Sequence, residues 1–339
     1  MFYTIGIANI CIAFFFLKVN KKIKMLGVRK MENNTAIANF NVTFGEKEEP
    51  MLTHFRDIIL PAFNSDIKRE TGYGEKKDKY YFVNSRVADV DGEEVFTGQL
   101  VKDTELEVKS KIVNEELVPT DEHYPAAPYS VFYIFLRNHR MILIRNQKGS
   151  PDLRSFRVTA STIIGRYIKR NNSADDCKTV LPEANVEVIG IPTLETWNNI
   201  FRQVKKVRSL ELRFFPLNGD KNFNPVVDAL TGIFLKETRA KQGRLKVGLC
   251  DSIEGVKNIV SNLDGIMEPT VVVDFEERKK AKIRNNTIQG NHTINLDEHG
   301  INDPDRVVPL ARELDSIRKV SDENQKIYNT YKNGNQQND

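Results

Sequence analysis

The chain has 339 residues, 40% of them apolar, and is therefore long enough to bury two ordinary cores. Its net charge of +4 comes from the first 30 residues, which hold six lysines and arginines and no acid, whereas the remainder holds 44 basic against 46 acidic side chains. This balance excludes a uniformly basic protein that binds polyanions over its whole surface, and three widely spaced cysteines exclude a disulfide framework or a paired-cysteine zinc motif.

The leader, residues 1–30, begins with an apolar run from Met1 to Leu17. As a helix this run would be about 25 Å long, which is short for a hydrocarbon core of roughly 30 Å. Three interpretations stay open: an upstream start with the working protein beginning at Met25 or Met31, a short membrane anchor, and a buried strand. Unpaired cysteines predict a cytoplasmic body, which in the anchor case is attached to the inner face of the membrane.

Residues 31–150 are predicted to form a mainly antiparallel β-rich domain. Alternating apolar residues predict a half-buried strand over Thr35–Thr43, and helical spacing predicts a helix after Pro50 that Pro61 kinks or ends. Asp91-Gly92 and the segment 137–140 indicate hairpins between short β-type runs. The further predicted strands are Tyr80–Val87, Val95–Val101, Leu106–Val113, Val131–Leu136 and Met141–Ile144.

Residues 151–300 alternate between helical and β-type patterns. Helices are predicted over Leu153–Arg170, Thr193–Val207, Pro225 to about Lys241, and Ser252–Leu263. Strands are predicted over Val186–Ile191, Leu210–Phe215, Leu245–Leu249 and Val271–Ile283. The alternation predicts an α/β sandwich domain, in its simplest form a ferredoxin-like split arrangement, so the expected fold class of the whole chain is α+β.

Residues 301–339 carry one more amphipathic pattern. Val307, Leu310 and Leu314 keep helical spacing and predict a helix from Pro304 to about Tyr328. Its apolar side either docks on its own domain or forms a homo-oligomer through residues 304–328. The residues after Tyr331 are expected to be disordered.

Four cations alternate near the end of the second domain: Arg278, Lys280, Lys282 and Arg284. In one strand they would share a face at intervals of about 6.6 Å. They lie in residues 186–285, which hold 17 basic against 13 acidic side chains. The pattern predicts a stripe that contacts a nucleic-acid backbone, with a duplex favoured because few aromatics lie near it. The alternative is an edge strand protected by its charges.

Two further basic clusters extend the predicted nucleic-acid surface. Both are expected at the ends of helices, where cations also complement the helix dipole, so a structural role is their alternative. The first cluster is Lys205, Lys206 and Arg208, and the second is Lys236, Arg239, Lys241 and Arg244.

No catalytic residue, metal ligand or cofactor is predicted, and the five histidines show no metal-ligand spacing. The competing interpretation is a metal-dependent nuclease in which Asp274 and Glu276 share a strand face. There Glu277 and Lys279 supply the spacing at which a carboxylate holds a cation and a lysine steadies water. Both, however, would fall on the face that Val271 and Val273 should bury. A protein-interaction subunit without nucleic-acid binding is the third interpretation.

The order of elements over residues 186–285 resembles the C-terminal part of RexA-like and KwaB-like phage-exclusion proteins. The residues that carry the resemblance are the strand 186–192, the Trp197-containing helix, and the strand 209–216 before another helix. The resemblance implies a bacterial anti-phage defence component that binds DNA and acts with a partner protein, often a membrane protein. It is one of arrangement over roughly 100 residues and carries no site residue over to this chain.

Overall fold

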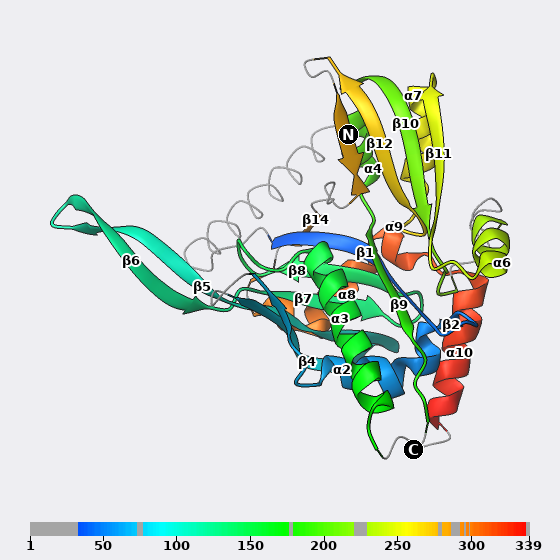
Figure 1. Ribbon diagram of the computed structural model, residues 1–339, viewed down its shortest axis with the longest axis horizontal. Helices are drawn as coiled ribbons and strands as arrows, with labels where there is room; N and C mark the ends of the chain where they lie inside the picture. The colour runs from blue at the N-terminus through cyan, green and yellow to red at the C-terminus, as the bar shows by residue number, and fades with distance from the viewer. Residues whose placement is uncertain are drawn as a thin grey trace, which may run out of the picture.

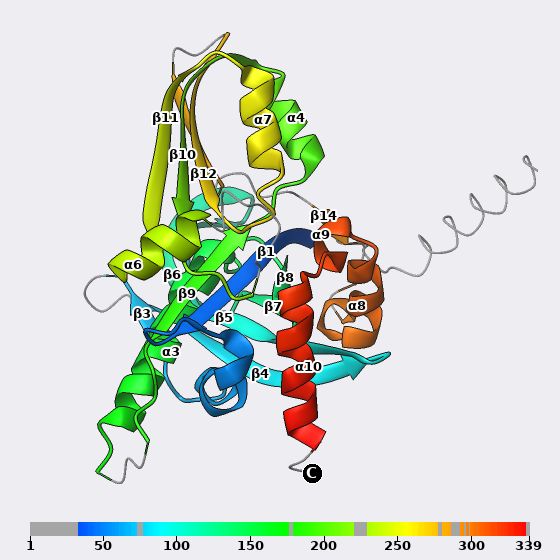
Figure 2. The same ribbon diagram turned by 90° about the vertical axis from the view of Figure 1, so that its right-hand side faces the viewer.

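The computed structural model describes residues 33–72, 77–175, 179–219, 229–276, 280–285, 292–294, 296–297 and 299–336. The leader and Arg278 lie outside these ranges. Figures 1 and 2 show two sheets with helices packed against them. The α+β class is thus confirmed. Among the described residues, no helix is both long and apolar enough to cross a membrane.

The larger sheet has ten strands, paired antiparallel throughout the described residues. Its main path runs in the order β14-β1-β8-β7-β5-β4-β3, with β2 and β9 paired to β1, and β6 paired to β5. The strands are β1 (Asn33–Phe44), β2 (Glu49–Pro50), β3 (Arg69–Thr71), β4 (Asp78–Val90), β5 (Glu93–Val113), β6 (Glu116–Ala126), β7 (Tyr129–Phe135), β8 (Arg140–Arg145), β9 (Ala184–Gly190) and β14 (His292–Ile294).

Strand β1 is buried on both faces, although its alternation predicted a half-buried strand. Every residue from Thr35 to Phe44 is buried, including Asn39 and Asn41. The amide of Asn41 is satisfied by a distant segment: its Nδ2 donates to the carbonyl of Pro216 at 2.7 Å, and its Oδ1 accepts from the backbone of Asn218 at 2.7 Å. Polar side chains can be buried when they find hydrogen-bond partners. The polar positions of β1 therefore also face the interior of the protein.

Two cores lie on the two sides of this sheet. The first packs β1 residues such as Phe40 under α3 (Leu153–Asn172) and under the helical turns η1 (Met51–His54), η2 (Phe55–Ile59) and α2 (Leu60–Phe63). The second contains Val307, Ala311 and Ile317 from the C-terminal helices. The predicted helices after Pro50 and over Leu153–Arg170 are confirmed.

The C-terminal segment is divided more finely than its periodicity predicted. It contains η5 (Gly300–Asn302), α8 (Pro304–Arg312), α9 (Asp315–Arg318) and α10 (Asp322–Gln336). Apolar residues of α8 and α9 are buried in the second core, so these helices dock on their own chain. Disorder after Tyr331 was a wrong prediction, because α10 continues to Gln336. Tyr331 packs against Phe55, which ties this end of the helix to the first core.

The Asp91-Gly92 hairpin is confirmed, and both residues have positive φ, as a tight hairpin turn requires. The strand after it does not end near Val101 as predicted. β5 runs on for 21 residues, and its outer part pairs only with β6 among the described residues. The β5–β6 hairpin thus extends away from the rest of the molecule (Figure 1).

The smaller sheet has four strands in the order β11-β10-β12-β13, all antiparallel. In chain order, its strands and the helices that accompany them are α4 (Leu194–Phe201), β10 (Val204–Phe214), η3 (Leu230–Leu235), α6 (Lys236–Thr238), β11 (Gly243–Cys250), α7 (Ile253–Ser261), β12 (Glu268–Phe275) and β13 (Ala281–Arg284). β11 and β12 both pair antiparallel with β10 and are joined through α7, so they form one split βαβ unit, but the complete ferredoxin-like arrangement with two such units is not confirmed. We call residues 191–285 the sheet lobe and the other described residues the body. The strand β9, expected in the second domain, pairs with β1 of the body.

The predicted turn at residues 137–140 is confirmed between β7 and β8, and it buries a histidine. His139 has a left-handed φ of 58° and is fully buried. Burial lowers the pKa of His139 to about 3, and the charge of Arg140 acts in the same direction. Neighbouring Asn138 donates from Nδ2 to the carbonyls of Ile317 at 2.6 Å and Lys319 at 2.9 Å. This turn thus joins the sheet to the C-terminal segment.

Acidification from about pH 7 to pH 5 should cost about 2 kcal/mol of unfolding free energy through His139 alone. The unfolded chain takes up a proton near pH 6.5, whereas the folded protein resists protonation until pH about 3. This contribution is therefore present above pH 6.5 and is lost as the pH falls. Urea unfolding at several pH values measures it, with His139→Asn as the control because Asn tolerates positive φ. An equal acid sensitivity in the variant contradicts the assignment.

Candidate nucleic-acid interface

The four-stranded sheet has one covered face and one open face. Helices α4 and α7 lie together on the covered face (Figure 2). There Trp197 and Val260 pack against Val207 and Val271 of the strands. Thr193 and Ser252 cap these helices with side-chain oxygens that accept backbone N–H groups. Because side chains alternate along a strand, the intervening residues of β10 and β12 point away from the helices.

The strand register arranges the open face in rows, because residues directly opposite each other share a face. The row nearest the body pairs Arg244 with Arg213. The next rows, from β11 to β13, are Lys246–Glu211–Thr270–Arg284 and Gly248–Ser209–Val272–Lys282. In the outermost row Lys206 lies opposite Asp274.

Cations gather at both edges of this face and on the outer end of the inner strand β10. We call the set the cationic face; it consists of exposed residues from three strands, namely Lys206, Arg208, Arg244, Lys246, Lys282 and Arg284. The edge strands β11 and β13 are three strand spacings apart, or roughly 14 Å. Between these edges, the inner strands β10 and β12 present small or polar residues such as Ser209 and Thr270, together with the carboxylate of Glu211.

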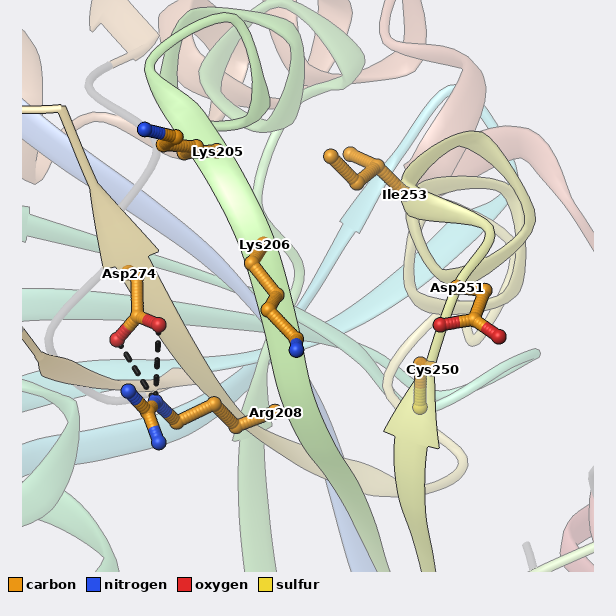
Figure 3. A pocket seen from close by; sticks show the side chains of 7 residues that line it. All are labelled: Lys205, Lys206, Arg208, Cys250, Asp251, Ile253 and Asp274. Carbon is orange, nitrogen blue, oxygen red and sulfur yellow. Dashed lines mark hydrogen bonds and ion pairs between the residues drawn. The ribbon is translucent and has the colours of Figure 1, made fainter.

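A hollow of about 540 Å³ lies at the outer end of the cationic face (Figure 3). Lys205 and Lys206 line it from β10, opposite Cys250 and Asp251 at the end of β11. Arg208 Nε donates to both carboxylate oxygens of Asp274, at 2.8 and 2.9 Å, and this bond raises the pKa of Arg208. Among the described residues, neither Lys205 nor Lys206 has a carboxylate partner, so their charges remain available to an anion.

The predicted single strand Val271–Ile283 is wrong, because the chain turns back between β12 and β13. Charged residues are poor strand formers, and five of them occur in succession at 276–280, where the turn falls. Lys282 and Arg284 lie on β13, Lys280 precedes that strand, and Arg278 is outside the described residues. The stripe is thus shorter than predicted. Its strand forms an edge of the sheet, as the alternative interpretation expected.

The other predicted cations divide into two groups. Lys205, Lys206 and Arg208 are strand residues of β10, because α4 ends at Phe201, so their placement at a helix end was wrong. Arg244 also lies on the open face, on β11, where it is 3.7 Å from Glu211.

Arg239 and Lys241 do not join the cationic face. Arg239 follows α6 and lies 4.0 Å from Glu46, and Lys241 Nζ lies 2.9 Å from Glu183. Both cations are therefore paired with carboxylates of the body. Lys246 belongs to the face although the sequence did not single it out. The sequence pattern that could have identified Lys246 is its position two residues after Arg244 in a β-type run. The same alternation marked Lys282 and Arg284.

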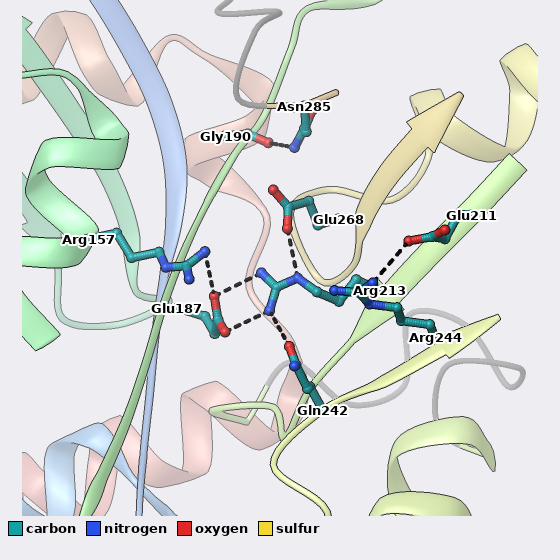
Figure 4. A network of polar contacts seen from close by, with 9 residues as sticks. All are labelled: Arg157, Glu187, Gly190, Glu211, Arg213, Gln242, Arg244, Glu268 and Asn285. Atoms are coloured by element: carbon teal, nitrogen blue, oxygen red, sulfur yellow. Dashed lines mark hydrogen bonds and ion pairs between the residues drawn. The ribbon is translucent and has the colours of Figure 1, made fainter. Parts of the chain in front are cut away.

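A buried ionic network fixes the sheet lobe on the body (Figure 4). Arg213 of β10 donates from Nη1 and Nη2 to the two oxygens of Glu187 in β9, at 2.7 and 2.9 Å, and from Nε to Glu268 at 2.7 Å. Arg157 of α3 lies 3.3 Å from the same Glu187. Burial alone lowers the pKa of Arg213, but the hydrogen bonds and charges of Glu187 and Glu268 outweigh it and raise that pKa.

No protein-family model matches the chain, and no curated protein matches it in sequence. The resemblance to RexA-like and KwaB-like proteins therefore stays a prediction. Glu277 and Lys279 of the nuclease interpretation lie outside the described residues.

Removing the charge of Glu187 should destabilise the folded protein, because Arg213 and Arg157 would lose the buried carboxylate that they share. We expect Glu187→Gln to lower the free energy of unfolding by about 3–5 kcal/mol. The matched control is Glu211→Gln, since Glu211 makes a partly exposed ion pair with Arg244 and should lose less than about 1 kcal/mol. Urea unfolding of both variants measures the difference. Equal losses would show that the Arg213 network does not hold the lobe.

Proposed function

We propose that the cationic face binds the phosphate backbone of duplex DNA and that the protein acts without catalysing a reaction on it. The observation that carries this proposal is the arrangement of cations along two strands on opposite edges of an uncovered sheet face. Backbone cations supply the sequence-independent part of DNA affinity by displacing condensed counterions. A face of this kind positions the protein on DNA without reading the bases.

The spacing of the two edges favours a duplex. They lie roughly 14 Å apart, close to the major-groove width of about 12 Å. Lys246 on one edge and Lys282 on the other can therefore approach phosphates on the two sides of one groove. Glu211 and Thr270 lie between the two edges and face the groove in this arrangement, so the carboxylate of Glu211 lies away from the phosphates. The rows of the open face hold no aromatic residue among those described, so stacking of unpaired bases has no platform.

The nuclease alternative has weaker support. Asp274 is held by a two-oxygen contact with Arg208, which occupies the carboxylate that a metal ion would need. The proposal extends to the setting that the resemblance implies: a cytoplasmic component of a bacterial anti-phage defence system that acts with a partner protein. Binding by charge suits this role, since it requires no particular phage sequence.

Two charge reversals on opposite edges test the proposal. If four cations each neutralise a phosphate, the slope of log affinity against log salt is about −3.6, a loss of roughly 150-fold between 50 and 200 mM salt. Lys246→Glu with Lys282→Glu should reduce the slope by about 1.8 and weaken binding at low salt at least tenfold. Fluorescence anisotropy with a labelled duplex, in a salt series, measures both quantities.

The control carries the same change of net charge elsewhere. Arg154→Glu with Lys169→Glu alters two exposed cations of α3 and should leave the slope within experimental error. If both double variants lose affinity equally, only the total charge matters and the cationic face is not the site. Wild-type affinity that does not fall with salt overturns the proposal. Magnesium-dependent cleavage that Asp274→Ala abolishes would favour the nuclease alternative.

A further inference from the structure

The outer part of the β5–β6 hairpin exposes apolar side chains far from the cationic face. We call residues 104–126 the arm; it projects beyond both cores (Figure 1). Ile112 and Leu117 near its tip are 76% and 73% exposed, and Leu106 and Tyr124 nearer its base are 58% and 50% exposed. An isolated two-stranded hairpin is only marginally stable in water, so an arm of this length gains stability from a partner.

The exposed apolar residues share one face of the arm. Leu106 pairs with Tyr124, and Ile112 pairs with Leu117, at even-numbered positions of β5. Even-numbered positions of the same strand within the body, such as Leu100, are buried in the first core beneath α3. The arm thus continues the core-facing side of the sheet past the point where helices cover it.

This face carries almost no charge. Its eight positions on the two strands are Leu106, Val108, Ser110, Ile112, Leu117, Pro119, Glu122 and Tyr124. Glu122 is the one charged residue among them, and it is paired with Lys111 and accepts a hydrogen bond from Tyr124 Oη at 2.6 Å. Covering the face therefore buries no unpaired carboxylate. The face also offers no unpaired charge with which an oppositely charged partner could pair.

We propose that the arm is a dimerisation element, and that its apolar face packs against the same face of a second copy of this chain. Identical apolar faces complement each other, and a two-fold contact covers both at once and leaves neither open. At these exposures the four large side chains offer roughly 500 Å² per arm, so a symmetric pair buries about 1,000 Å², the lower limit for a specific interface. The dimer is therefore of moderate affinity. This inference is independent of DNA binding.

The earlier candidate for self-association, residues 304–328, does not offer such a surface. Val307, Val308, Ala311 and Ile317 are buried in the second core of their own chain. Tyr328 is buried in the first core. The arm, in contrast, leaves four large apolar side chains exposed together on one face.

Sedimentation velocity of the full chain from about 1 to 100 µM tests the proposal. The weight-average mass should rise with concentration toward twice the 38.8 kDa of the monomer. Ile112→Thr with Leu117→Thr should raise the dissociation constant at least about tenfold. The matched control is Val113→Thr with Val118→Thr, which changes two exposed residues on the opposite face and should alter that constant by less than about twofold. Thr preserves strand propensity at all four positions.

A second variant guards against local misfolding. Replacing residues 105–125 by Asn-Gly joins the paired residues Thr104 and Ala126 through a tight turn and removes the arm. It should keep the thermal midpoint of the body and sediment as a monomer. A wild-type chain that stays monomeric overturns the proposal, as does a dimer that survives removal of the arm. An Ile112→Thr, Leu117→Thr variant that dimerises as the control does would overturn it equally.

Discussion

Burial of β1 on both faces is the constraint on which the rest of the structure depends. One side of the strand supplies Phe40 and Val42 to the core under α3, and the other side places Asn39 and Asn41 inside the protein. Both amides bond to backbone of the sheet lobe: Asn41 to Pro216 and Asn218, and Asn39 through its Nδ2 to the carbonyl of Gly265 at 3.5 Å. The same residues that complete the body therefore position the lobe.

Features set by nearby residues could be predicted from the sequence, whereas features set by distant partners could not. The Asp91-Gly92 turn and the helix α3 depend on a few neighbouring side chains, and both were predicted. The burial of Asn41 depends on Asn218, which is 177 residues away in the chain. For the candidate site, alternation marked Lys282 and Arg284, but only the sheet register shows that Lys246 lies in the same row as Arg284.

The ionic network around Arg213 explains why cations of one strand have different roles. Lys206, Arg208 and Arg213 all lie on β10, but Arg213 is at the end that meets the body and is nine-tenths buried. There its charge is matched by Glu187 and Glu268, whereas Lys206 at the outer end remains in solvent. A buried arginine paired in this way sets orientation, because any tilt of the lobe separates ions that have already lost their water. The cationic face is thus held in a fixed direction.

Charge also separates the two surfaces for which we propose partners. The arm holds six carboxylates against two lysines over residues 104–126, so a duplex with one negative charge per roughly 1.7 Å is repelled from it. The cationic face lies on a lobe that projects in another direction (Figure 1). DNA and a second copy therefore do not compete for one surface. A dimer joined through the arms carries two cationic faces, and the second face then meets the duplex at a high effective concentration. Modest affinity at each face is sufficient when both can reach one DNA molecule.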